Sequence, residues 1–427
     1  MMETVKPQLA PHDRCTGCGA CASGCPKGAI QMVRDREGFL YPQIGDGCVS
    51  CGHCAHVCPV LKQREVRDRP AAFAAWNADE AVRACSTAGG VFTALARYVL
   101  EGGGVVFGAA LDEKLQVRHI AVKDPEELRL LRGAKPIQSE LGETFQQVQR
   151  YLDQGRAVLF VGAPCQVDGL YRFLGEHPEK LLTCDFVCGG VGSPGVWARF
   201  VDSMTYVKRR PAVDVHFCDK QKGEKQRRFR VWFQGGGTFD APLSRCQPGR
   251  GIMRRLFLRP CCYRCAYTNT NRPGDLTMGL YTGLPKEFYA QEQRGGVSVL
   301  LVNTVKGAHI FDQLPLKRER RTLEEAVAGN AALRAPAVQP TDRQRFFDEL
   351  EHLPFRKVCD RFFSVRPYQV HAPGKLAALK EKLWKPAAHP ALWPVSISCA
   401  ARGSSRYPIG SIPISIPIRN TRPAGTR

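Results

Sequence analysis

Continuous apolar runs alternate with amphipathic segments through much of this chain. Residues 157–162 and 180–187 are almost wholly apolar, as is typical of parallel strands covered on both faces. Residues 166–174 lie between them and predict a short helix, so this stretch is expected to be strand, helix, strand. Similar patterns predict further strands over 71–76, 105–110 and 115–122, a helix over 91–101, and a helix N-terminus at Asp124-Pro125.

The second half of the chain is patterned differently. Residues 205–245 look rich in β-structure, with turns at Lys222-Gly223 and at 235–237, and residues 340–383 favour helices. Residues 386–427 contain seven prolines and five arginines but no acidic residue. That composition is typical of an unstructured tail.

The overall composition indicates a globular protein of a reducing compartment. The chain has 427 residues, 44% of them hydrophobic, which is enough for two or three domains. No run of roughly 18 apolar residues predicts a membrane span, and residues 1–13 lack the apolar stretch of a signal peptide. Nineteen cysteines without an export signal predict a cytoplasmic protein, in which thiols serve metals.

The net charge of +21 is distributed unevenly. Residues 206–270 contain fifteen Lys and Arg but four Asp and Glu, so this stretch carries +11 of it. Such an excess suits nucleic acid, an acidic partner or an anionic cofactor. No zinc finger, helix-turn-helix or aromatic RNA-binding signature accompanies it, so we expect no nucleic-acid partner.

Two blocks of four cysteines near the start of the chain carry the clearest chemistry. Both have the spacing C-x2-C-x2-C-x3-C-P, which holds two [4Fe-4S] clusters in bacterial ferredoxins. Three thiolates in one tight turn reach three irons of a cube, and the fourth is directed at the other cube. The predicted ligands are Cys15, Cys18, Cys21 and Cys58 for the first cluster, and Cys48, Cys51, Cys54 and Cys25 for the second.

Two other uses of these cysteines fit the spacing less well. A disulfide framework needs an oxidising compartment, and nothing in the sequence exports the chain. Zinc usually takes two C-x2-C pairs rather than two blocks of this form.

A further set of cysteines lies in the predicted α/β part. Cys165 follows strand 157–162 and Cys188 follows strand 180–187. A right-handed strand–helix–strand unit returns its second strand parallel to the first, so both cysteines would lie at the same carboxyl edge of the sheet. Adjacent strands are roughly 4.8 Å apart, which lets two thiolates share one centre. A candidate third [4Fe-4S] site therefore comprises Cys165, Cys188, Cys262 and Cys265.

The residues alone leave alternatives open at this third site. Cys165 and Cys188 would also suit buried structural thiols. Cys246 and Cys261 are alternative ligands, whereas Cys184 lies too far back along its strand to share the site.

Several short motifs occur in an order that resembles one protein family. They are Ser86-Thr87-Ala88-Gly89-Gly90, Gly162-Ala163-Pro164-Cys165-Gln166, Cys188-Gly189-Gly190-Val191-Gly192-Ser193-Pro194, Cys262-x2-Cys265 and Gly274-Asp275-Leu276-Thr277-Met278-Gly279. Over about residues 70–350 the chain resembles the beta subunits of coenzyme F-420-reducing hydrogenase and F-420-dependent formate dehydrogenase. Some members of that family carry a ferredoxin module in front, as this chain does.

The resemblance implies FAD, a [4Fe-4S] cluster, and electron transfer through the flavin to a deazaflavin or another two-electron substrate. FAD binding rests on this resemblance alone, because no G-x-G-x-x-G fingerprint follows a strand. Gly189 and Gly274 stand where the family often has His and Ala, which leaves the substrate open. The family motifs assign the cluster to Cys165, Cys188, Cys262 and Cys265, and place Ser86, Thr87, Gly89, Gly90 and Lys135 close to the flavin.

We therefore expect an α+β multidomain protein, in which a ferredoxin-like module with two [4Fe-4S] clusters precedes a mixed α/β flavin-binding domain. The expected function is that of an iron–sulfur flavin-dependent oxidoreductase, which exchanges electrons with a ferredoxin or redox partner subunit and with a small two-electron substrate. The alternative is a polyferredoxin-like carrier without flavin. The expected parts are the two-cluster module (1–66), the N-terminal and catalytic parts of the flavoprotein domain (67–150 and 151–350), a helical extension (351–385) and the tail (386–427).

Overall fold

The computed structural model describes residues 6–62, 66–219, 227–284 and 296–363. The chain divides into two units, residues 1–386 and 387–427, and every described residue belongs to the first. Three predicted features lie outside the described residues, namely the tail at 386–427, the end of the helical region at 364–383 and the turn at Lys222-Gly223.

The N-terminal module repeats one small unit, in which a cysteine-bearing loop leads into a short helix. Helix α1 spans Ala20–Ser23 and α2 spans His53–His56, and each follows a glycine in the left-handed conformation. Gly19 (φ 74°) and Gly52 (φ 75°) adopt it without the steric penalty that a Cβ adds. Between the two helices lie the antiparallel strands β1 (Ile30–Arg34) and β2 (Leu40–Ile44).

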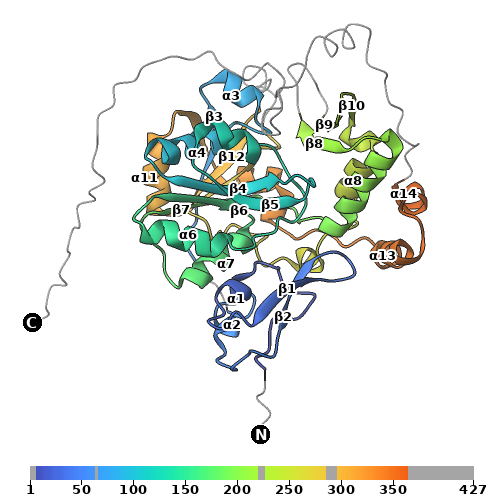
Figure 1. The fold of residues 1–427 in the computed structure, drawn as a ribbon. Helices are drawn as coiled ribbons and strands as arrows, with labels where there is room; N and C mark the ends of the chain where they lie inside the picture. The colour runs from blue at the N-terminus through green and yellow to red at the C-terminus, as the bar shows by residue number, and fades with distance from the viewer. Residues whose placement is uncertain (1–5, 63–65, 220–226, 285–295, 364–427) are drawn as a thin grey trace, which may run out of the picture. The chain divides into compact units, whose positions relative to one another are not determined.

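Within the described residues, a sheet of eight strands forms the centre of the α/β part (Figure 1). Its spatial order is β13-β3-β12-β11-β7-β6-β4-β5. Strands β4, β6, β7 and β11 run parallel, while β5, β12 and β13 are antiparallel to their neighbours. The strands span Ala71–Asn77 (β3), Val105–Leu111 (β4), Val117–Val122 (β5), Val158–Gly162 (β6), Leu181–Phe186 (β7), Leu276–Leu280 (β11), Ser298–Val302 (β12) and Leu316–Arg321 (β13).

The strand directions bring several loops to one edge of this sheet. Strand β3 is antiparallel to β12, which is antiparallel to β11, so β3 runs the same way as β4, β6, β7 and β11. Their carboxyl ends share an edge, which holds the turn of residues 86–90 after β3, Cys165 after β6 and Cys188 after β7. The parallel pairing of β6 with β7 confirms the predicted strand–helix–strand unit.

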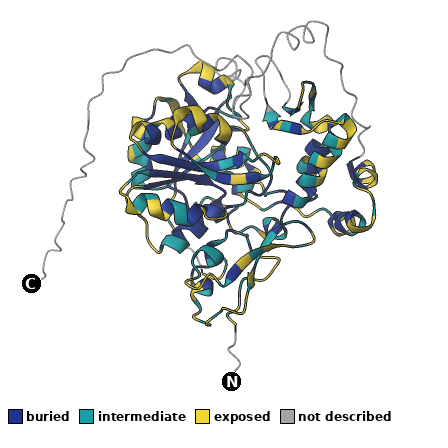
Figure 2. Ribbon diagram, in the orientation of Figure 1, coloured by how far each residue is buried: buried dark blue, intermediate teal, exposed yellow. Residues whose placement is uncertain are grey.

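Helices cover both faces of the sheet (Figure 1). Alternate strand residues divide between two cores, because successive side chains point to opposite faces. Val106 and Leu159 pack with α4, whereas Phe107 and Phe160 pack with α6 and α7, and the strands are correspondingly buried in Figure 2. The first face carries α4 (Val91–Glu101), α5 (Leu128–Leu131) and α11 (Val305–Gln313), and the second carries α6 (Thr144–Asp153) and α7 (Pro164–Leu174).

The N-terminal module shares one of these cores. Cys18, Ala20 and Val57 lie in the same cluster of buried apolar side chains as Phe145 of α6 and Leu170 of α7. Burial of apolar surface is the main favourable term in association of this kind. The module is therefore packed onto the α/β part through the helix that carries Cys165.

A separate aromatic core supports a second, three-stranded antiparallel sheet of order β10-β9-β8. Trp197, Phe217 and Phe229 pack there at ring distances of 4.7–6.3 Å. The elements around this core are α8 (Pro194–Lys208), β8 (Ala212–Asp219), β9 (Arg228–Phe233), β10 (Thr238–Pro242), η2 (Leu243–Arg245), α9 (Gln247–Met253), α13 (Arg343–His352) and α14 (Phe355–Phe363). The remaining short helices are α3 (Glu80–Ala84), η1 (Pro125–Glu127), η3 (Pro260–Arg264), α12 (Leu323–Gly329) and η5 (Ala331–Leu333).

The element predictions are confirmed where the structure describes the chain. The helix at 91–101 has the predicted bounds, and Asp124 caps η1 by accepting the Glu126 N–H. Strands β8, β9 and β10 lie in the predicted β-rich stretch 205–245, although helix α8 extends into it as far as Lys208 and η2 ends it. Helices α13 and α14 lie in the predicted helical stretch 340–383. Within the described ranges, no helix is both long enough and apolar enough to cross a bilayer.

Candidate metal centre

The first group of thiols combines three cysteines of one block with the last cysteine of the other. Burial, with the charges of Cys15 and Cys58, raises the pKa of Cys18 to about 12. Burial and the charges of Cys18, Cys15 and Cys58 raise the pKa of Cys21 as well. The structure thus brings Cys15, Cys18 and Cys21 together with Cys58, in the crossed arrangement that the spacing predicts, while their ligation of a cluster stays a prediction.

The second group lies at the more exposed end of the module. Burial, with the charges of Cys48 and Cys51, raises the pKa of Cys54. Cys51 is exposed, whereas Cys18 of the first group is buried. A Cβ added to Gly24, beside Cys25, would lie 3.3 Å from the side chain of His53, beside Cys54, so the turn before Cys25 lies next to helix α2, and ligation by Cys25 in this group stays a prediction.

The third group draws its thiols from three separate segments. Cys165 lies in the first turn of α7, Cys188 follows β7, and Cys262 and Cys265 lie in and just after η3. Burial raises the pKa of Cys165, and the charges of the other three cysteines raise it further. Burial and the charges of Cys262 and Cys265 likewise raise the pKa of Cys188 to about 12. The four predicted ligands of the third cluster therefore lie together, while their ligation of a cluster stays a prediction.

The other thiols considered for this site lie elsewhere or beside it. Cys184 is buried in the sheet core, and its thiol faces the Asp185 carbonyl oxygen at 3.6 Å. Cys246 lies in the aromatic core, 3.6 Å from the Leu243 carbonyl oxygen. Cys261 adjoins the group, because its interaction with Cys262 is the largest influence that raises the pKa of the Cys262 thiol.

A cavity of about 930 Å³ opens beside the third group. All four cysteines line it, together with residues 59–62 of the N-terminal module and residues 331, 332 and 334–338. Its cationic lining residues are Arg14, Lys62, Arg255, Arg264 and Arg334, and its acidic one is Asp168, which accepts a hydrogen bond from Tyr267 at 2.8 Å. The cavity therefore presents a positive surface next to the third group.

Two observations test whether these residues suit [4Fe-4S] clusters. Backbone N–H groups donate to three of the sulfurs, from Ala29 to Cys25 at 3.3 Å, from Ser50 to Cys48 at 3.4 Å and from Tyr267 to Cys265 at 3.4 Å. Such bonds stabilise the thiolate that a metal ligand becomes. Among the described residues, no three His, Cys, Asp or Glu side chains converge closely enough to hold a single metal ion.

The second observation is a buried cation among the thiols. Arg259 is fully buried, and its guanidinium donates to the Cys15 carbonyl oxygen at 2.7 Å and approaches the Cys15 sulfur at 3.8 Å. A buried charge needs an opposite charge nearby. Thiolates that ligate a cluster would supply that negative charge, so the donor set fits the group.

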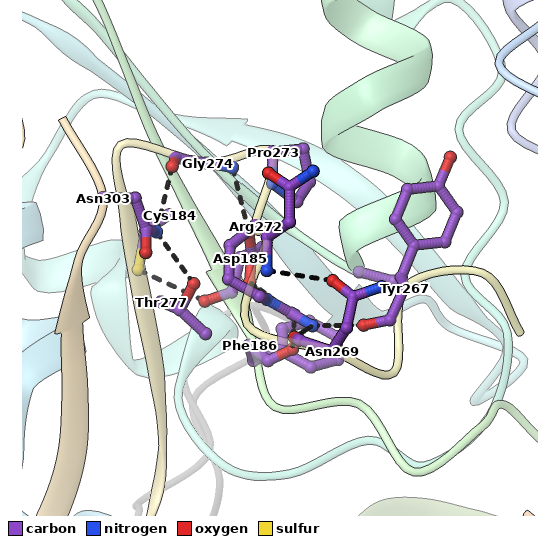
Figure 3. Close-up of polar contacts among 12 residues, drawn as sticks. Cys184, Asp185, Phe186, Tyr267, Asn269, Arg272, Pro273, Gly274, Thr277 and Asn303 are labelled. Carbon is purple, nitrogen blue, oxygen red and sulfur yellow. Dashed lines mark hydrogen bonds and ion pairs between the residues drawn. The ribbon is translucent and has the colours of Figure 1, made fainter. Parts of the chain in front are cut away.

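A buried ion pair positions the segment that follows the third group (Figure 3). Arg272 donates to Asp185 Oδ1 from Nε at 3.0 Å and from Nη2 at 2.6 Å, and the two side chains are 1% and 0% exposed. The other carboxylate oxygen accepts the Gly274 N–H at 2.9 Å. Asp185 is the penultimate residue of β7, three residues before Cys188, and Arg272 follows Cys265, so the pair fixes two cysteine-bearing segments to each other.

Of the predicted flavin contacts, the turn of residues 86–90 lies at the same sheet edge as the third group, but away from the cavity. The Gly89 N–H donates to Ser298 Oγ at 2.9 Å, and Gly90 (φ 83°) is the N-cap residue of α4. Strands β12 and β11 separate β3 from β7, which places the turn roughly 14 Å from the end of β7. Lys135 donates to the Arg132 carbonyl oxygen at 2.8 Å, and burial lowers its pKa to about 8. None of Ser86, Thr87, Gly89, Gly90 and Lys135 lines the cavity described above.

Sequence reasoning missed the polar residues that support the third group. Asp185 sits in an apolar strand, and a carboxylate there implies a buried partner, which is a usable signal. Arg259 belongs to the basic stretch 206–270, whose charge suits an acidic partner or an anionic cofactor, whereas its side chain is buried against the first group. Nearby Arg254 and Arg264 pair with Asp342 and Asp13.

The two cysteine blocks and the α/β domain define an iron–sulfur protein of the electron-transfer class. Residues 14–61 match the model of the 4Fe-4S dicluster domain. Residues 72–145 and 155–327 match those of the N-terminal and C-terminal parts of the coenzyme F420 hydrogenase/dehydrogenase beta subunit. The chain belongs to this beta-subunit family, with a dicluster domain in front, as the sequence motifs predict.

One solved structure similar to this chain comes from the F420-reducing [NiFe] hydrogenase complex of Methanosarcina barkeri. The two chains are 18% identical, and the match covers 73% of this chain and 99% of that one, with a TM-score of 0.43. No curated protein matches the chain.

Proposed function

We propose that this protein is an iron–sulfur flavoprotein that moves electrons between ferredoxin-type [4Fe-4S] clusters and a two-electron substrate such as coenzyme F-420. Bound clusters would supply one-electron transfer, and bound FAD would interconvert single electrons and a hydride. The proposed ligands are the eight cysteines of the N-terminal module and, for a third cluster, Cys165, Cys188, Cys262 and Cys265.

Helix α7 carries this proposal, because it joins the first and third groups of thiols. Cys165 and Gly169 are four residues apart, so they lie on the same face of the helix. A Cβ added to Gly169 would lie 2.9 Å from the Cys18 sulfur, and the charge of Cys18 raises the pKa of Cys165 after those of its own group. One helical turn therefore separates the module from the α/β domain's own thiols.

The positions of the three groups of thiols favour one direction of electron transfer. The second group includes exposed Cys51 and suits electron entry from a ferredoxin or redox partner subunit. The first group includes the buried Cys15 and Cys18, and the third lies at the carboxyl edge of the sheet, where open α/β sheets build their sites. The turn of residues 86–90 at that edge would hold the flavin. The family's description as a beta subunit supports a partner subunit.

The proposal is tested on protein purified anaerobically after iron and sulfide reconstitution. Three clusters require about twelve iron atoms per chain and two require about eight, and acid treatment should release FAD. Cys165→Ser should remove about four iron atoms, while Cys218→Ser, a half-buried thiol of β8, should remove none. About eight iron atoms with no flavin in the wild type would show a pure electron carrier instead.

A further inference from the structure

The guanidinium of Arg259 has no carboxylate partner among the described residues, although it is fully buried. Its Nη1 donates to Gln138 Oε1 at 2.9 Å, and its Nη2 donates to the Leu40 carbonyl oxygen at 3.0 Å. The remaining polar contacts go to the Cys15 carbonyl oxygen and sulfur. The charge also lies over the ring of Tyr41 at 4.1 Å. These partners satisfy the N–H groups, but none of them carries a permanent negative charge.

The other buried arginines near the module and the third group are neutralised directly. Arg272 pairs with Asp185, and Arg343 pairs with Glu37 through both carboxylate oxygens. Burial of a cation is unfavourable unless an anion is close. Arg259 therefore differs from Arg272 and Arg343 in having cysteine as its nearest potential anion.

The backbone of Arg259 connects to the third group, while its side chain reaches the first. The Arg259 N–H donates to the Val191 carbonyl oxygen at 3.0 Å, three residues after Cys188. The Arg259 carbonyl oxygen accepts the Cys262 N–H at 2.9 Å. The residue thus lies between two segments of the third group and the loop that holds Cys15.

The loop of the first group is shaped to admit this side chain. Gly17 has φ +66°, and a Cβ there would lie 2.7 Å from Arg259 Nη1. Gln138 accepts from Arg259 and donates its own amide to the Thr16 carbonyl oxygen at 3.0 Å. Both features hold the guanidinium against residues 15–17.

We propose that Arg259 is a shared positive charge that raises the reduction potentials of the first and third clusters together. This inference rests on the proposed function, because it concerns two clusters that the cysteine groups would hold. Each reduction adds one electron and no proton to a cluster, so the negative charge increases by one. A fixed buried cation stabilises that added charge, and charge and hydrogen bonds near the sulfurs are known determinants of cluster potential. Arg259 acts through the thiolates and is a positioning residue rather than a catalytic one.

The experiment is an anaerobic redox titration of the full chain, in which electron paramagnetic resonance follows each cluster. Arg259→Gln should make reduction of the first and third clusters at least tenfold less favourable, which corresponds to about 59 mV for one electron. The second cluster should change less. Arg259→Lys keeps the charge but not the planar fork, and it should stay closer to the wild type than Arg259→Gln. If Arg259→Gln fails to fold, the potentials of Arg259→Lys are compared with those of the wild type instead.

Gln138→Ala is the matched structural control. It removes the contacts to Arg259 and Thr16 while the charge remains, so both potentials should stay near their wild-type values. The inference is overturned if Arg259→Gln leaves the first and third potentials unchanged, or if Arg259→Lys or Gln138→Ala shifts them as much. A wild type without a third cluster would overturn the proposed function as well, whereas three clusters with unmoved potentials would overturn this inference alone.

Discussion

Breaking the buried pair of Asp185 and Arg272 should both destabilise the protein and release iron from the third site. The Asp185 carboxylate accepts two bonds from Arg272 and one from the Gly274 N–H, and neither side chain has appreciable exposure. Removal of one partner from such a pair leaves an uncompensated buried charge, which costs about 3–5 kcal/mol. Asp185→Asn and Arg272→Met should each lower the free energy of unfolding by about that amount.

The double variant Asp185→Asn, Arg272→Met distinguishes charge from packing. It leaves no lone buried charge, so its cost should be less than the sum of the two single costs. Anaerobic urea unfolding, followed by circular dichroism, measures the three free energies. Each single variant should also fall from about twelve iron atoms toward about eight, because the pair fixes the segments of Cys188 and Cys265.

The opposite result would refute this reasoning in a specific way. Single variants within about 1 kcal/mol of the wild type would show that water or relaxation compensates the charge. A double variant as costly as the sum would show that the two side chains contribute independently.

Four further predictions follow from individual residues. Gly169→Ala should destabilise the first cluster, since its Cβ would lie 2.9 Å from the Cys18 sulfur. Gly102→Ala is the control, because its Cβ would meet nothing closer than 3.5 Å. The rate of iron loss on dilution should be higher for Gly169→Ala than for Gly102→Ala. Gly89→Ala should reduce bound flavin at unchanged iron content, because its Cβ would lie 2.4 Å from the Ala75 carbonyl oxygen. Burial lowers the pKa of His119 to about 4. As the pH falls, the unfolded chain therefore takes up this proton before the folded one, and about 2 kcal/mol of stability should be lost between pH 7 and pH 5. Urea titrations of His119→Gln should show a smaller loss. Iron removal by an anaerobic chelator should lower the thermal unfolding midpoint, because cluster binding contributes to folding and Arg259 would lose its counter-charge.

Local patterns in the sequence were sufficient to predict most of the elements and the cysteine groups. The apolar runs at 157–162 and 180–187 predict two strands, and the handedness of their connection places Cys165 and Cys188 at one edge. The ferredoxin spacing predicts that Cys58 crosses to the first group, and the structure brings it there. These inferences succeed because they depend on contacts between neighbouring elements.

The supporting polar contacts could not be predicted in the same way. The bond from Arg259 to Cys15 joins residues 244 positions apart, and that from Arg272 to Asp185 joins residues 87 apart. Periodicity reports which face of an element is buried, but it does not report which distant side chain meets it there. The many arginines of residues 250–264 look equivalent in sequence, and burial alone separates Arg259 from the others.

The core shared by Cys18, Ala20 and Val57 with helix α7 bears on how this protein would operate. Carrier domains on long tethers swing between donor and acceptor, and solvent viscosity slows them. Here the module is anchored by interior packing, so electrons would cross a stationary junction. The rate of electron transfer within the protein should therefore be insensitive to added glycerol, while the rate of encounter with an external donor should fall as the solvent viscosity increases.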